Sequence, residues 1–466
     1  MQRLYAIFVP MVKTDKNNIK ITLLALGCSK NLIDCENMST ELKNAGYNVI
    51  NDVPASDIVV INTCGFIESA KKEAIDAILE VADFKVPDGN VKKIIVSGCL
   101  SQRYPEDILK ELPEVDAVLG TAHYGDIVPV VEELVTELDE QDTQKINLTS
   151  GKGGFSHLVK DRDLSTEAYA WLKIGEGCIH RCSFCAIPLI RGPFVSRPME
   201  DILEEARIIA DKGIKEIVLA AQDTTNYGIE LYKERRLSEL LNKLSEIEGI
   251  EMIRVMYGYM DGITPELIEE MAKNPKIAHY LDIPIQHGCD KILKAMYRRD
   301  TADLITSRLE MIRKAMPDCI IRTTVMVGFP GETEEDFLVM KENLKKWKFD
   351  RLGCFIFSPE EGTPAYDMPD QIDDETKKRR YDEIYELQKG ISLELSQKRL
   401  GTVTKVNICE VSDDGIFYIG RSFGESPEVD PVIYIASQEE ELKIGDMVDV
   451  KIVDCSDEYD MTAVTI

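Results

Sequence analysis

The amino-acid sequence predicts a multidomain α/β protein: an N-terminal doubly wound parallel α/β sheet, a central partial (β/α)6 barrel of the TIM type and a small OB-like β-barrel at the end. Apolar runs alternate with segments of helical period from residue 20 to about 140, and a second alternation of the same kind begins at residue 169. After residue 400 the pattern changes to short β-rich runs separated by turn residues. A chain of 466 residues is also too long for one ordinary core, which supports several domains.

The N-terminal region, 20–140, contains the apolar runs ITLLALG, DIVVINTCG and KKIIVSGC, and each is followed by a segment of helical period such as 69–82. Strands that are apolar on both faces and are joined by helices predict a parallel, doubly wound sheet. Residues 141–168 are polar and contain three glycines, so we expect a linker there. Residues 1–19 are expected to be an extension rather than a signal peptide, because Pro10 interrupts their apolar run and no small-residue cleavage site follows.

Six strand candidates follow in the region 169–385: AYAWLKIGEGC, EIVLAAQD, EMIRVMYGY, HYLDIPIQHG, CIIRTTVMVGFPGE and DRLGCFIFSP. Helical segments such as 199–212 and 301–315 lie between them, and Thr333 is expected to cap the helix after VGFPGE. Six βα units predict a partial barrel whose reactive residues lie at the carboxyl ends of the strands. A closed eight-stranded barrel is not expected because the count stops at six.

The last part of the chain begins with a helical repeat formed by Ile384, Leu387, Ile391 and Leu395. Gly401 follows this repeat, so a connecting helix is expected at 386–399. The runs TVTKVNICEV, GIFYIGRSF, PVIYIA and DMVDVKIVD then predict a small β-barrel at 400–466.

Composition and charge limit the classes of function. The net charge of −28 repels a nucleic-acid backbone and attracts basic partners, although a plain solvated acidic surface is equally consistent with it. No apolar stretch reaches the roughly 18 residues that a membrane helix needs, and the twelve cysteines do not form a short disulfide-rich pattern. We therefore expect a soluble cytoplasmic protein without membrane partners. Neither a Ser-His-Asp pattern nor a P-loop supports a hydrolase or a nucleotide kinase.

Three cysteines stand close together in the stretch GCIHRCSFCA: Cys178, Cys182 and Cys185. They follow the first predicted barrel strand with C-x3-C-x2-C spacing. Three thiolates on a short loop can hold three irons of a 4Fe-4S cluster and leave the fourth iron open for another ligand. Structural zinc is the alternative, but zinc needs a fourth ligand, and His180 lies between the first two cysteines, where it is poorly placed to close the same tetrahedron.

A second group of cysteines is dispersed along the N-terminal region, and each member ends an apolar run: Cys28, Cys64 and Cys99. The carboxyl ends of parallel strands share one edge of a sheet, so we expect the three turns to converge. A glycine beside each cysteine permits close backbone approach. Three more thiolates then form a second cluster site, again one ligand short, with three buried core cysteines as the alternative.

The other six cysteines show no grouping, and core packing is expected of them: Cys35, Cys289, Cys319, Cys354, Cys409 and Cys455. Cys35 lies seven residues after Cys28, so a role as substitute ligand also stays open for it.

The cysteine-rich stretch resembles the radical S-adenosylmethionine (SAM) superfamily, in which the residue before the third cysteine is usually aromatic, as Phe184 is here. The resemblance implies that the open iron binds the amino and carboxylate groups of SAM, that Phe184 lies near the adenine, and that reduction cleaves SAM to a 5′-deoxyadenosyl radical. The superfamily commonly binds the SAM amino group through a Gly-Gly-Glu turn at the end of the second strand. Ala221, Gln222 and Asp223 stand there in this chain, so a SAM contact from Gln222 carries over by position only. Gly328 and Gly331 in VGFPGE are candidates for a turn that contacts SAM. A structural hydrogen bond or a plain strand-to-helix turn is the alternative at these positions.

An N-terminal sheet with three dispersed cysteines, a radical SAM barrel and a C-terminal β-domain together resemble the methylthiotransferases, over essentially the whole chain after residue 20. This resemblance implies two 4Fe-4S clusters, one that binds SAM and one auxiliary, a C-terminal domain of the TRAM type and an electron donor protein. The motifs LGCSKNLIDCEN, CAIPLIRG, DRLGCFIFSPEEGTPA and GRSFGESPEVDPVIYI look like the branch that modifies an aspartate of small-subunit ribosomal protein S-twelve at its β-carbon. Cys35 departs from that pattern, since serine is more usual at its position.

The charge of the last domain bears on the choice of branch. Residues 397–466 contain six basic and fifteen acidic side chains, which suits a basic ribosomal protein, so we do not expect direct RNA binding. Glu425, Glu428 and Asp430 are candidates for that contact, with a plain solvated edge as the alternative for each. Two other functions stay open: methylthiolation of a transfer-RNA adenosine, and a non-catalytic role as an acidic ribosome-binding or sulfur-carrier iron-sulfur protein.

Overall fold

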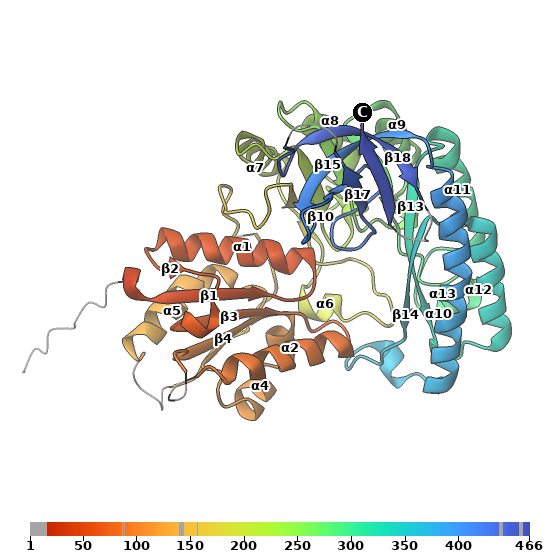
Figure 1. The fold of residues 1–466 in the computed structure, drawn as a ribbon. Coiled ribbons are helices and arrows are strands. Elements are labelled where there is room, and N and C mark those ends of the chain that lie inside the picture. Colours follow the sequence, from red (N-terminus) through yellow and green to blue (C-terminus); the bar gives the residue numbers. More distant parts are fainter. Residues whose placement is uncertain are drawn as a thin grey trace, which may run out of the picture. The chain divides into compact units, whose positions relative to one another are not determined.

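The computed structural model describes residues 16–85, 87, 89–138, 144–155, 157–437, 441–455 and 460–466 (Figure 1). Most of the extension expected at 1–19 therefore lies outside the described residues. The chain divides into two compact units: the first comprises the described residues of Met1–Gly65, Ser69–Gly151 and Ser156–Val159, and the second those of Phe66–Glu68, Lys152–Phe155 and Lys160–Ile466. None of the described helices has the length and apolar composition needed to cross a bilayer.

The first unit is built on a parallel six-stranded sheet with the strand order β2-β1-β3-β4-β5-β6. Its strands are β1 (Lys20–Ala25), β2 (Asn48–Val49), β3 (Ile58–Thr63), β4 (Lys93–Gly98), β5 (Ala117–Leu119) and β6 (Ile146–Leu148). Every residue of the two central strands, β3 and β4, is buried, as expected for a sheet covered on both faces. The doubly wound sheet that the sequence predicts is therefore confirmed.

Two sets of helices cover the faces of this sheet (Figure 1). One core contains residues of α1 (Ser29–Asn44) and α5 (Ile127–Thr136), and the other contains residues of α2 (Glu68–Ala82), α3 (Cys99–Arg103) and α4 (Pro105–Glu111). The apolar positions of α2 recur at helical spacing, with Ala74, Ile78 and Val81 buried. The helix expected at 69–82 matches α2.

The second unit contains a parallel sheet with the order β14-β13-β12-β11-β10-β7. Its strands are β7 (Tyr169–Lys173), β10 (Glu216–Ala220), β11 (Met252–Val255), β12 (Ile277–Asp282), β13 (Ile320–Val327) and β14 (Arg351–Ile356). Six strands in sequential order, joined by helices, are the partial barrel that the sequence predicts. One core beneath the helices runs along the whole sheet.

The connecting helices of this barrel are α7 (Met199–Asp211), α8 (Leu237–Ser245), α9 (Pro265–Lys273), α10 (Asp290–Ala295), α11 (Ala302–Ala315) and α12 (Glu334–Trp347). Helices α7 and α11 agree with the predicted segments to within a residue at each end. Thr333 and Asp336 form a capping box at the start of α12, which confirms the expected cap. Between β7 and α7 lie three short elements: β8 (Gly175–Glu176), α6 (Ile187–Ile190) and β9 (Val195–Ser196).

The chain ends in a long helix and a closed β-barrel within the second unit. Helix α13 (Asp374–Gln397) begins well before residue 386, and the side chain of Asp373 caps it. The barrel contains β15 (Val403–Val411), β16 (Tyr418–Arg421), β17 (Ile433–Ala436), β18 (Met447–Asp454) and β19 (Met461–Thr465), closed in the order β15-β16-β17-β19-β18. A small closed barrel is thus confirmed. The described residues also form short 3-10 turns at Lys16–Asn18, Val53–Ala55, Tyr124–Asp126, Thr224–Asn226, Met260–Gly262 and Pro364–Asp367.

Two observations bear on the expected domain boundaries. Strand β6 lies inside the segment 141–168 that was expected to be a linker, and it pairs with β5 as an edge strand of the first sheet. Helix α13 crosses residue 385, the expected end of the barrel domain. The boundaries 20–140, 169–385, 386–399 and 400–466 stay predictions.

Candidate active site

The three cysteines of the CxxxCxxC motif lie on one loop between β8 and α6, just after the barrel strand β7. Cys178 and Cys182 are buried and Cys185 is half-buried. Backbone hydrogen bonds fix the loop, from Cys178 N to Gly192 O at 3.1 Å and from Cys185 N to Cys182 O at 3.1 Å. The loop therefore presents three thiols at the carboxyl end of the barrel sheet, where chemistry is expected in this kind of fold.

The thiols of this loop are close enough to influence one another. Burial raises the pKa of Cys178 to about 12, and the nearby Cys182 adds to this rise. Burial also raises the pKa of Cys185, with further contributions from Cys182 and Cys178. Buried thiols that must lose protons to bind iron couple metal binding to proton release.

The chemistry of this donor set fits an iron-sulfur cluster better than a single metal ion. Within the part of the chain that the structure describes, no three His, Cys, Asp or Glu side chains are placed to hold one metal ion. A four-iron cluster binds each cysteine through a different iron, so the sulfurs need not converge on one point. His180, the nearest candidate for a fourth zinc ligand, instead has its Nε2 atom 2.7 Å from Asp223 Oδ2.

An aromatic and charged group surrounds Cys182. The hydroxyl of Tyr259, which follows β11, lies 3.5 Å from Cys182 Sγ. The Tyr259 ring is stacked on His180 with centroids 3.7 Å apart, and the guanidinium of Arg298 lies 4.5 Å from the ring centroid on a cation-π contact. Sequence reasoning missed Tyr259, and the available signal was its place directly after the third barrel strand, in RVMYGYM.

The turn after β13 is shaped by two glycines and a buried glutamate. Gly328 and Gly331 have φ of +74° and +77°, which favour glycine, and a Cβ on Gly328 would lie 2.3 Å from the Lys377 side chain of α13. The buried Glu332 carboxylate accepts hydrogen bonds from the backbone of Gly328 and, at 3.1 Å, of Phe329. Sequence reasoning missed Glu332. Whether this turn touches SAM stays a prediction.

Gln222 lies at the end of β10 in a buried polar group. Its Nε2 atom donates to Glu176 Oε1 at 2.7 Å, and the other oxygen of Glu176 accepts from Lys173 at 3.0 Å and from Arg191 at 3.2 Å. The Oε1 atom of Gln222 is buried and has no hydrogen-bond partner among the described residues. An acceptor oriented by Glu176 and left unsatisfied is suited to receive a donor from a ligand.

Phe184, the predicted adenine neighbour, belongs to a small apolar cluster that also contains Cys182, Phe329 and Phe357. Phe329 comes from the turn after β13 and Phe357 from the end of β14. The cluster thus joins the cysteine loop to the glycine turn. The structure brings Phe184 and the Gly328–Gly331 segment to one region of the barrel mouth.

In the first unit, the structure brings the turns that carry Cys28, Cys64 and Cys99 into contact. A Cβ on Gly27 would lie 2.5 Å from Cys64 Cβ, and a Cβ on Gly65 would lie 2.8 Å from the backbone of Leu100. Glycine is therefore required beside the cysteines because the three turns pack directly on one another. All twelve cysteines are thiols rather than disulfides, so none of these three sulfurs is committed to a disulfide bond.

Cys35 does not share this arrangement. It is buried in the core beneath α1, and its thiol points to the carbonyl of Leu24 at 3.8 Å. Burial raises its pKa well above the ordinary range. These contacts are those of a core cysteine, which is the role expected of most of the ungrouped cysteines.

Comparison with known proteins identifies the family. Residues 20–120 match the uncharacterized protein family UPF0004, residues 172–344 match the radical SAM superfamily and residues 400–466 match the TRAM domain. The ribosomal protein uS12 methylthiotransferase RimO of Acetivibrio thermocellus is 47% identical over 444 residues, 95% of this chain and 97% of that protein. The protein of the same name from Clostridioides difficile is 46% identical over 95% of this chain and 98% of its own length. The chain belongs to the RimO family.

Membership of the RimO family makes the protein a radical SAM methylthiotransferase that uses SAM and 4Fe-4S clusters. This confirms the resemblance drawn from the cysteine motif. Among solved structures, the radical SAM methyltransferase TsrM of Kitasatospora setae, with cobalamin and a [4Fe-4S] cluster bound, has a TM-score of 0.55 at 12% identity, over 74% of this chain and 76% of that one. OxsB, a cobalamin-dependent SAM radical enzyme, has a TM-score of 0.51 at 15% identity, over 80% and 56%. At such identities these two share only the fold with the RimO-family chain.

The acidic residues expected to contact a basic partner are largely engaged inside this RimO-family chain. Glu425 is fully buried, and Arg399 forms an ion pair with it. Burial alone would raise the pKa of Glu425, but Arg399 holds it at about 2. The carboxylate of Asp430 is 1% exposed and accepts a hydrogen bond from Tyr280 at 2.5 Å. The prediction that these two residues form a partner surface is wrong, because the loop between β16 and β17 packs them against the parallel sheet of the second unit and the residues that follow α13.

Glu428, the third of these residues, is exposed, yet its carboxylate also has partners within the chain. Its Oε1 atom accepts hydrogen bonds from Trp171 Nε1 at 3.0 Å and from the Tyr169 hydroxyl at 3.3 Å, both on β7. A charge count treats every carboxylate as solvated, and it therefore overstates the acidic surface that the last barrel offers to a partner.

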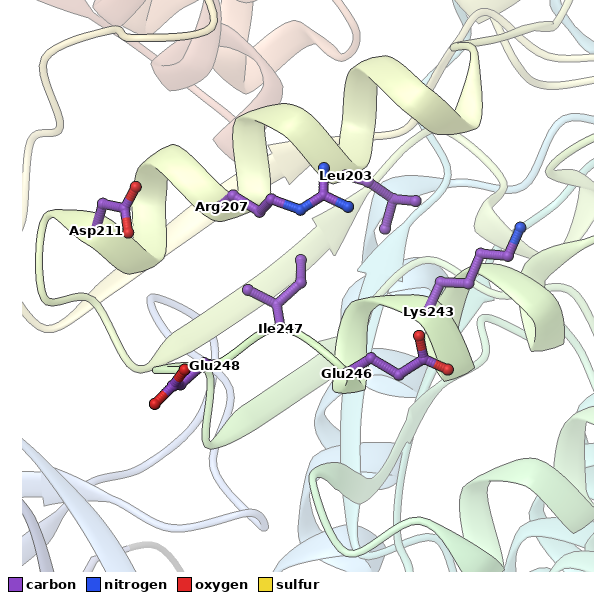
Figure 2. Close-up of a pocket in the computed structure, with 7 residues that line it drawn as sticks. All are labelled: Leu203, Arg207, Asp211, Lys243, Glu246, Ile247 and Glu248. Atoms are coloured by element: carbon purple, nitrogen blue, oxygen red, sulfur yellow. The ribbon is translucent and has the colours of Figure 1, made fainter.

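Two cavities of the RimO-family barrel differ in their relation to the cysteine loop. A pocket of about 490 Å³ lies between α7 and α8 and is lined by charged residues of both signs, including Arg207 and Glu246 (Figure 2). Its lining comes from α7, from the last turn of α8 and from the residues that follow α8, and it includes no residue of the cysteine loop. A smaller cavity of about 270 Å³ is lined by Cys182, His180 and Tyr259, so it is the one that adjoins the candidate active site.

Proposed function

We propose that this protein replaces a β-hydrogen of an aspartate in ribosomal protein uS12 with a methylthio group. Two observations support the proposal together. Each of the two units contains a group of three thiols, and the chain is similar over 95% of its length to proteins named uS12 methylthiotransferases. Inserting sulfur and a methyl group requires a radical source and a separate sulfur site, and two cluster sites supply both.

The proposed ligands follow from the two groups of thiols. Cys178, Cys182 and Cys185 would hold the SAM-binding 4Fe-4S cluster, and the auxiliary cluster would be held by Cys28, Cys64 and Cys99. With SAM and both clusters bound, reductive cleavage of one SAM would supply the hydrogen-abstracting radical, the auxiliary cluster would supply the sulfur, and a second SAM would donate the methyl group.

The side chains of the second unit would bind SAM and exclude water from it. The Gln222 amide nitrogen already donates a hydrogen bond to Glu176, which leaves the Oε1 atom without a donor. This oxygen is suited to accept a hydrogen bond from the ammonium group of SAM. The bare backbone of Gly328 and Gly331 allows a ligand to approach the turn closely. The apolar cluster around Phe184 keeps water from this region.

Mass spectrometry of the substrate tests the proposed function. The protein is reconstituted with iron and sulfide without oxygen and is incubated with small ribosomal subunits, SAM and dithionite. We expect uS12 to gain the mass of one methylthio group in place of one hydrogen, and fragmentation to place it on an aspartate. An unchanged uS12 together with a modified adenosine in added transfer RNA would assign the chain to the other branch. Iron binding without any SAM cleavage would indicate a non-catalytic carrier.

Replacing Tyr259 by phenylalanine is expected to lower the reduction potential of the cluster held by Cys182. A hydrogen bond donated to a ligand sulfur favours the more negative, reduced state, so removing the hydroxyl at 3.5 Å makes reduction harder. One such bond contributes about 0.5–1.5 kcal/mol, which corresponds to a few tens of millivolts for one electron. A redox titration followed by electron paramagnetic resonance measures the shift. Tyr297→Phe, on the same cavity, is the control and should leave the potential unchanged.

A further inference from the structure

The charged side chains that line the cavity beside Cys182 are mainly positive, although the chain as a whole is strongly acidic. The chain carries a net charge of −28, yet the lining of this cavity contains more basic than acidic side chains. We call its four arginines the arginine rim: Arg181, Arg235, Arg298 and Arg299. A local reversal of the overall charge marks a surface suited to a negatively charged partner.

Two members of the arginine rim are paired and two are not. Arg298 forms an ion pair with Asp300, and Arg235 forms one with Asp261 at 3.3 Å. Within the described ranges, neither Arg181 nor Arg299 forms an ion pair. Both are exposed, so their charges face solvent. The rim therefore has two positive charges that no side chain of the described residues compensates.

Apolar side chains lie beside these charges. Ile179 is 46% exposed and Tyr297 is 55% exposed, and both line the cavity. Tyr297 has a φ of +58°, a conformation that residues other than glycine rarely adopt, so the local backbone holds it there at a cost. Exposed tyrosine and arginine next to an aliphatic side chain are the residues that protein interfaces favour.

The same cavity reaches the candidate active site. Cys182 lines it together with His180 and Tyr259. The arginine rim and a proposed cluster ligand therefore belong to the wall of one cavity. Electron transfer becomes much slower with distance, and a donor must therefore approach the cluster at a place of this kind. The uncompensated positive charge, the exposed apolar side chains and the cavity that reaches Cys182 point to one partner. We infer that the arginine rim is the docking surface of a small acidic electron-transfer protein that carries a flavin or an iron-sulfur group.

This inference rests on the proposed function, because only a cluster at Cys178, Cys182 and Cys185 needs the electron. In each encounter the donor is oxidised by one electron and the cluster is reduced by one. No bond is made or broken in this step, and no proton is required. A nucleic-acid phosphate chain is another anion that arginines bind. It needs an extended basic track, however, and two uncompensated charges around an isoleucine and a tyrosine make only a small patch.

Charge reversal on the arginine rim, Arg181→Glu with Arg299→Glu, tests the docking surface. The probe is an acidic, FMN-carrying flavodoxin, and dithionite is the small reductant that needs no docking. We expect the variant to bind flavodoxin about tenfold or more weakly and to release 5′-deoxyadenosine more slowly by a similar factor when reduced flavodoxin is limiting, because like charges then face each other. With dithionite the rate should equal that of the unmodified protein, and the flavodoxin-driven rate of the unmodified protein should fall with added salt.

The matched control carries the same change of charge elsewhere: Arg207→Glu, on α7 (Figure 2), with Lys314→Glu, on α11. Both positions are exposed, and the control should behave like the unmodified protein with either reductant. Equal losses with dithionite and flavodoxin in the rim variant would overturn the docking surface and leave the proposed function in place. Unchanged flavodoxin binding, or a loss confined to ribosome or RNA binding, would overturn it as well. Absence of dithionite-driven cleavage in the unmodified protein would contradict the proposed function itself, and the inference with it.

Discussion

Replacing Cys178, Cys182 and Cys185 together by alanine is expected to abolish release of 5′-deoxyadenosine and to remove about half of the iron, from about eight to about four irons per chain. The three thiols lie on one loop and supply every protein ligand proposed for the SAM-binding cluster. Without them SAM has no open iron to bind, so the loss of cleavage should be complete rather than partial. Iron analysis after anaerobic reconstitution and chromatography of the nucleoside product measure the two effects.

The complementary variant, with Cys28, Cys64 and Cys99 replaced, separates the two sites. It should also lose about half of the iron, yet it should still cleave SAM with dithionite, because the barrel retains its own three thiols. Methylthiolation of uS12 should disappear. Cys409→Ala is the control, since Cys409 is half-buried, belongs to neither group and should leave iron and both activities unchanged. Full iron content in either triple variant would contradict the assignment of its ligands.

The sequence predicts both cysteine groups, for two different reasons. Cys178, Cys182 and Cys185 are close in sequence, so their spacing alone indicates a shared site. The convergence of the other three follows from topology, because the ends of neighbouring parallel strands share an edge of the sheet. The contact between the Gly27 turn and Cys64 bears this topological argument out at the level of the backbone.

Other residues of the candidate site could not be predicted because they depend on contacts between distant segments. Tyr259 is 77 residues from Cys182 in sequence. Its place directly after the third barrel strand indicates the barrel mouth, but it does not show that the hydroxyl lies against that sulfur. Glu332 looks like an ordinary residue at the start of a helix, but its carboxylate is buried and binds the backbone of the preceding turn. Such roles arise from packing, which local periodicity does not encode.

The charge of the C-terminal barrel misled the sequence analysis for a related reason. A count of acidic side chains does not show which of them are neutralised by partners inside the protein. Glu425 and Asp430 lie opposite arginine and tyrosine side chains of the barrel and of the residues after α13, so they stabilise the second unit instead of facing a ligand. The same region contains a buried carboxylate, Glu216, that pairs with two buried arginines.

Replacing Glu216 by alanine is expected to destabilise the second unit by about 3–5 kcal/mol, the usual cost of leaving buried charges uncompensated. Glu216 is the first residue of β10 and is fully buried. Its carboxylate lies 3.1 Å from Arg254 Nε on β11 and 3.0 Å from Arg421 Nη2 on β16, and Asn407 on β15 donates to it at 3.1 Å. Removing it leaves two buried guanidinium groups where the last barrel packs on the sheet.

The two tryptophans of the chain allow the loss of stability in Glu216→Ala to be measured in the second unit. Trp171 and Trp347 both belong to the second unit, and the indole of Trp171 donates to Glu428 of the last barrel. A shift of the urea midpoint in tryptophan fluorescence therefore reports on that unit and on the packing of its barrel. The control is Glu394→Ala, which breaks the exposed pair with Lys348 and should cost less than about 1 kcal/mol.

The pH dependence of the same transition gives an independent check. Burial alone would raise the pKa of Glu216, but Arg421 and Arg254 hold it below the ordinary value. A carboxyl group whose pKa is lower in the folded state contributes stability that is fully present above its unfolded pKa of about 4.3 and is lost as the pH falls below that value. The difference in stability between the unmodified protein and Glu216→Ala should therefore be largest near neutral pH and shrink in acid. A difference that stays constant down to pH about 3, or a variant as stable as the Glu394→Ala control, would show that the two arginines find other partners and that this carboxylate does not hold the barrel in place.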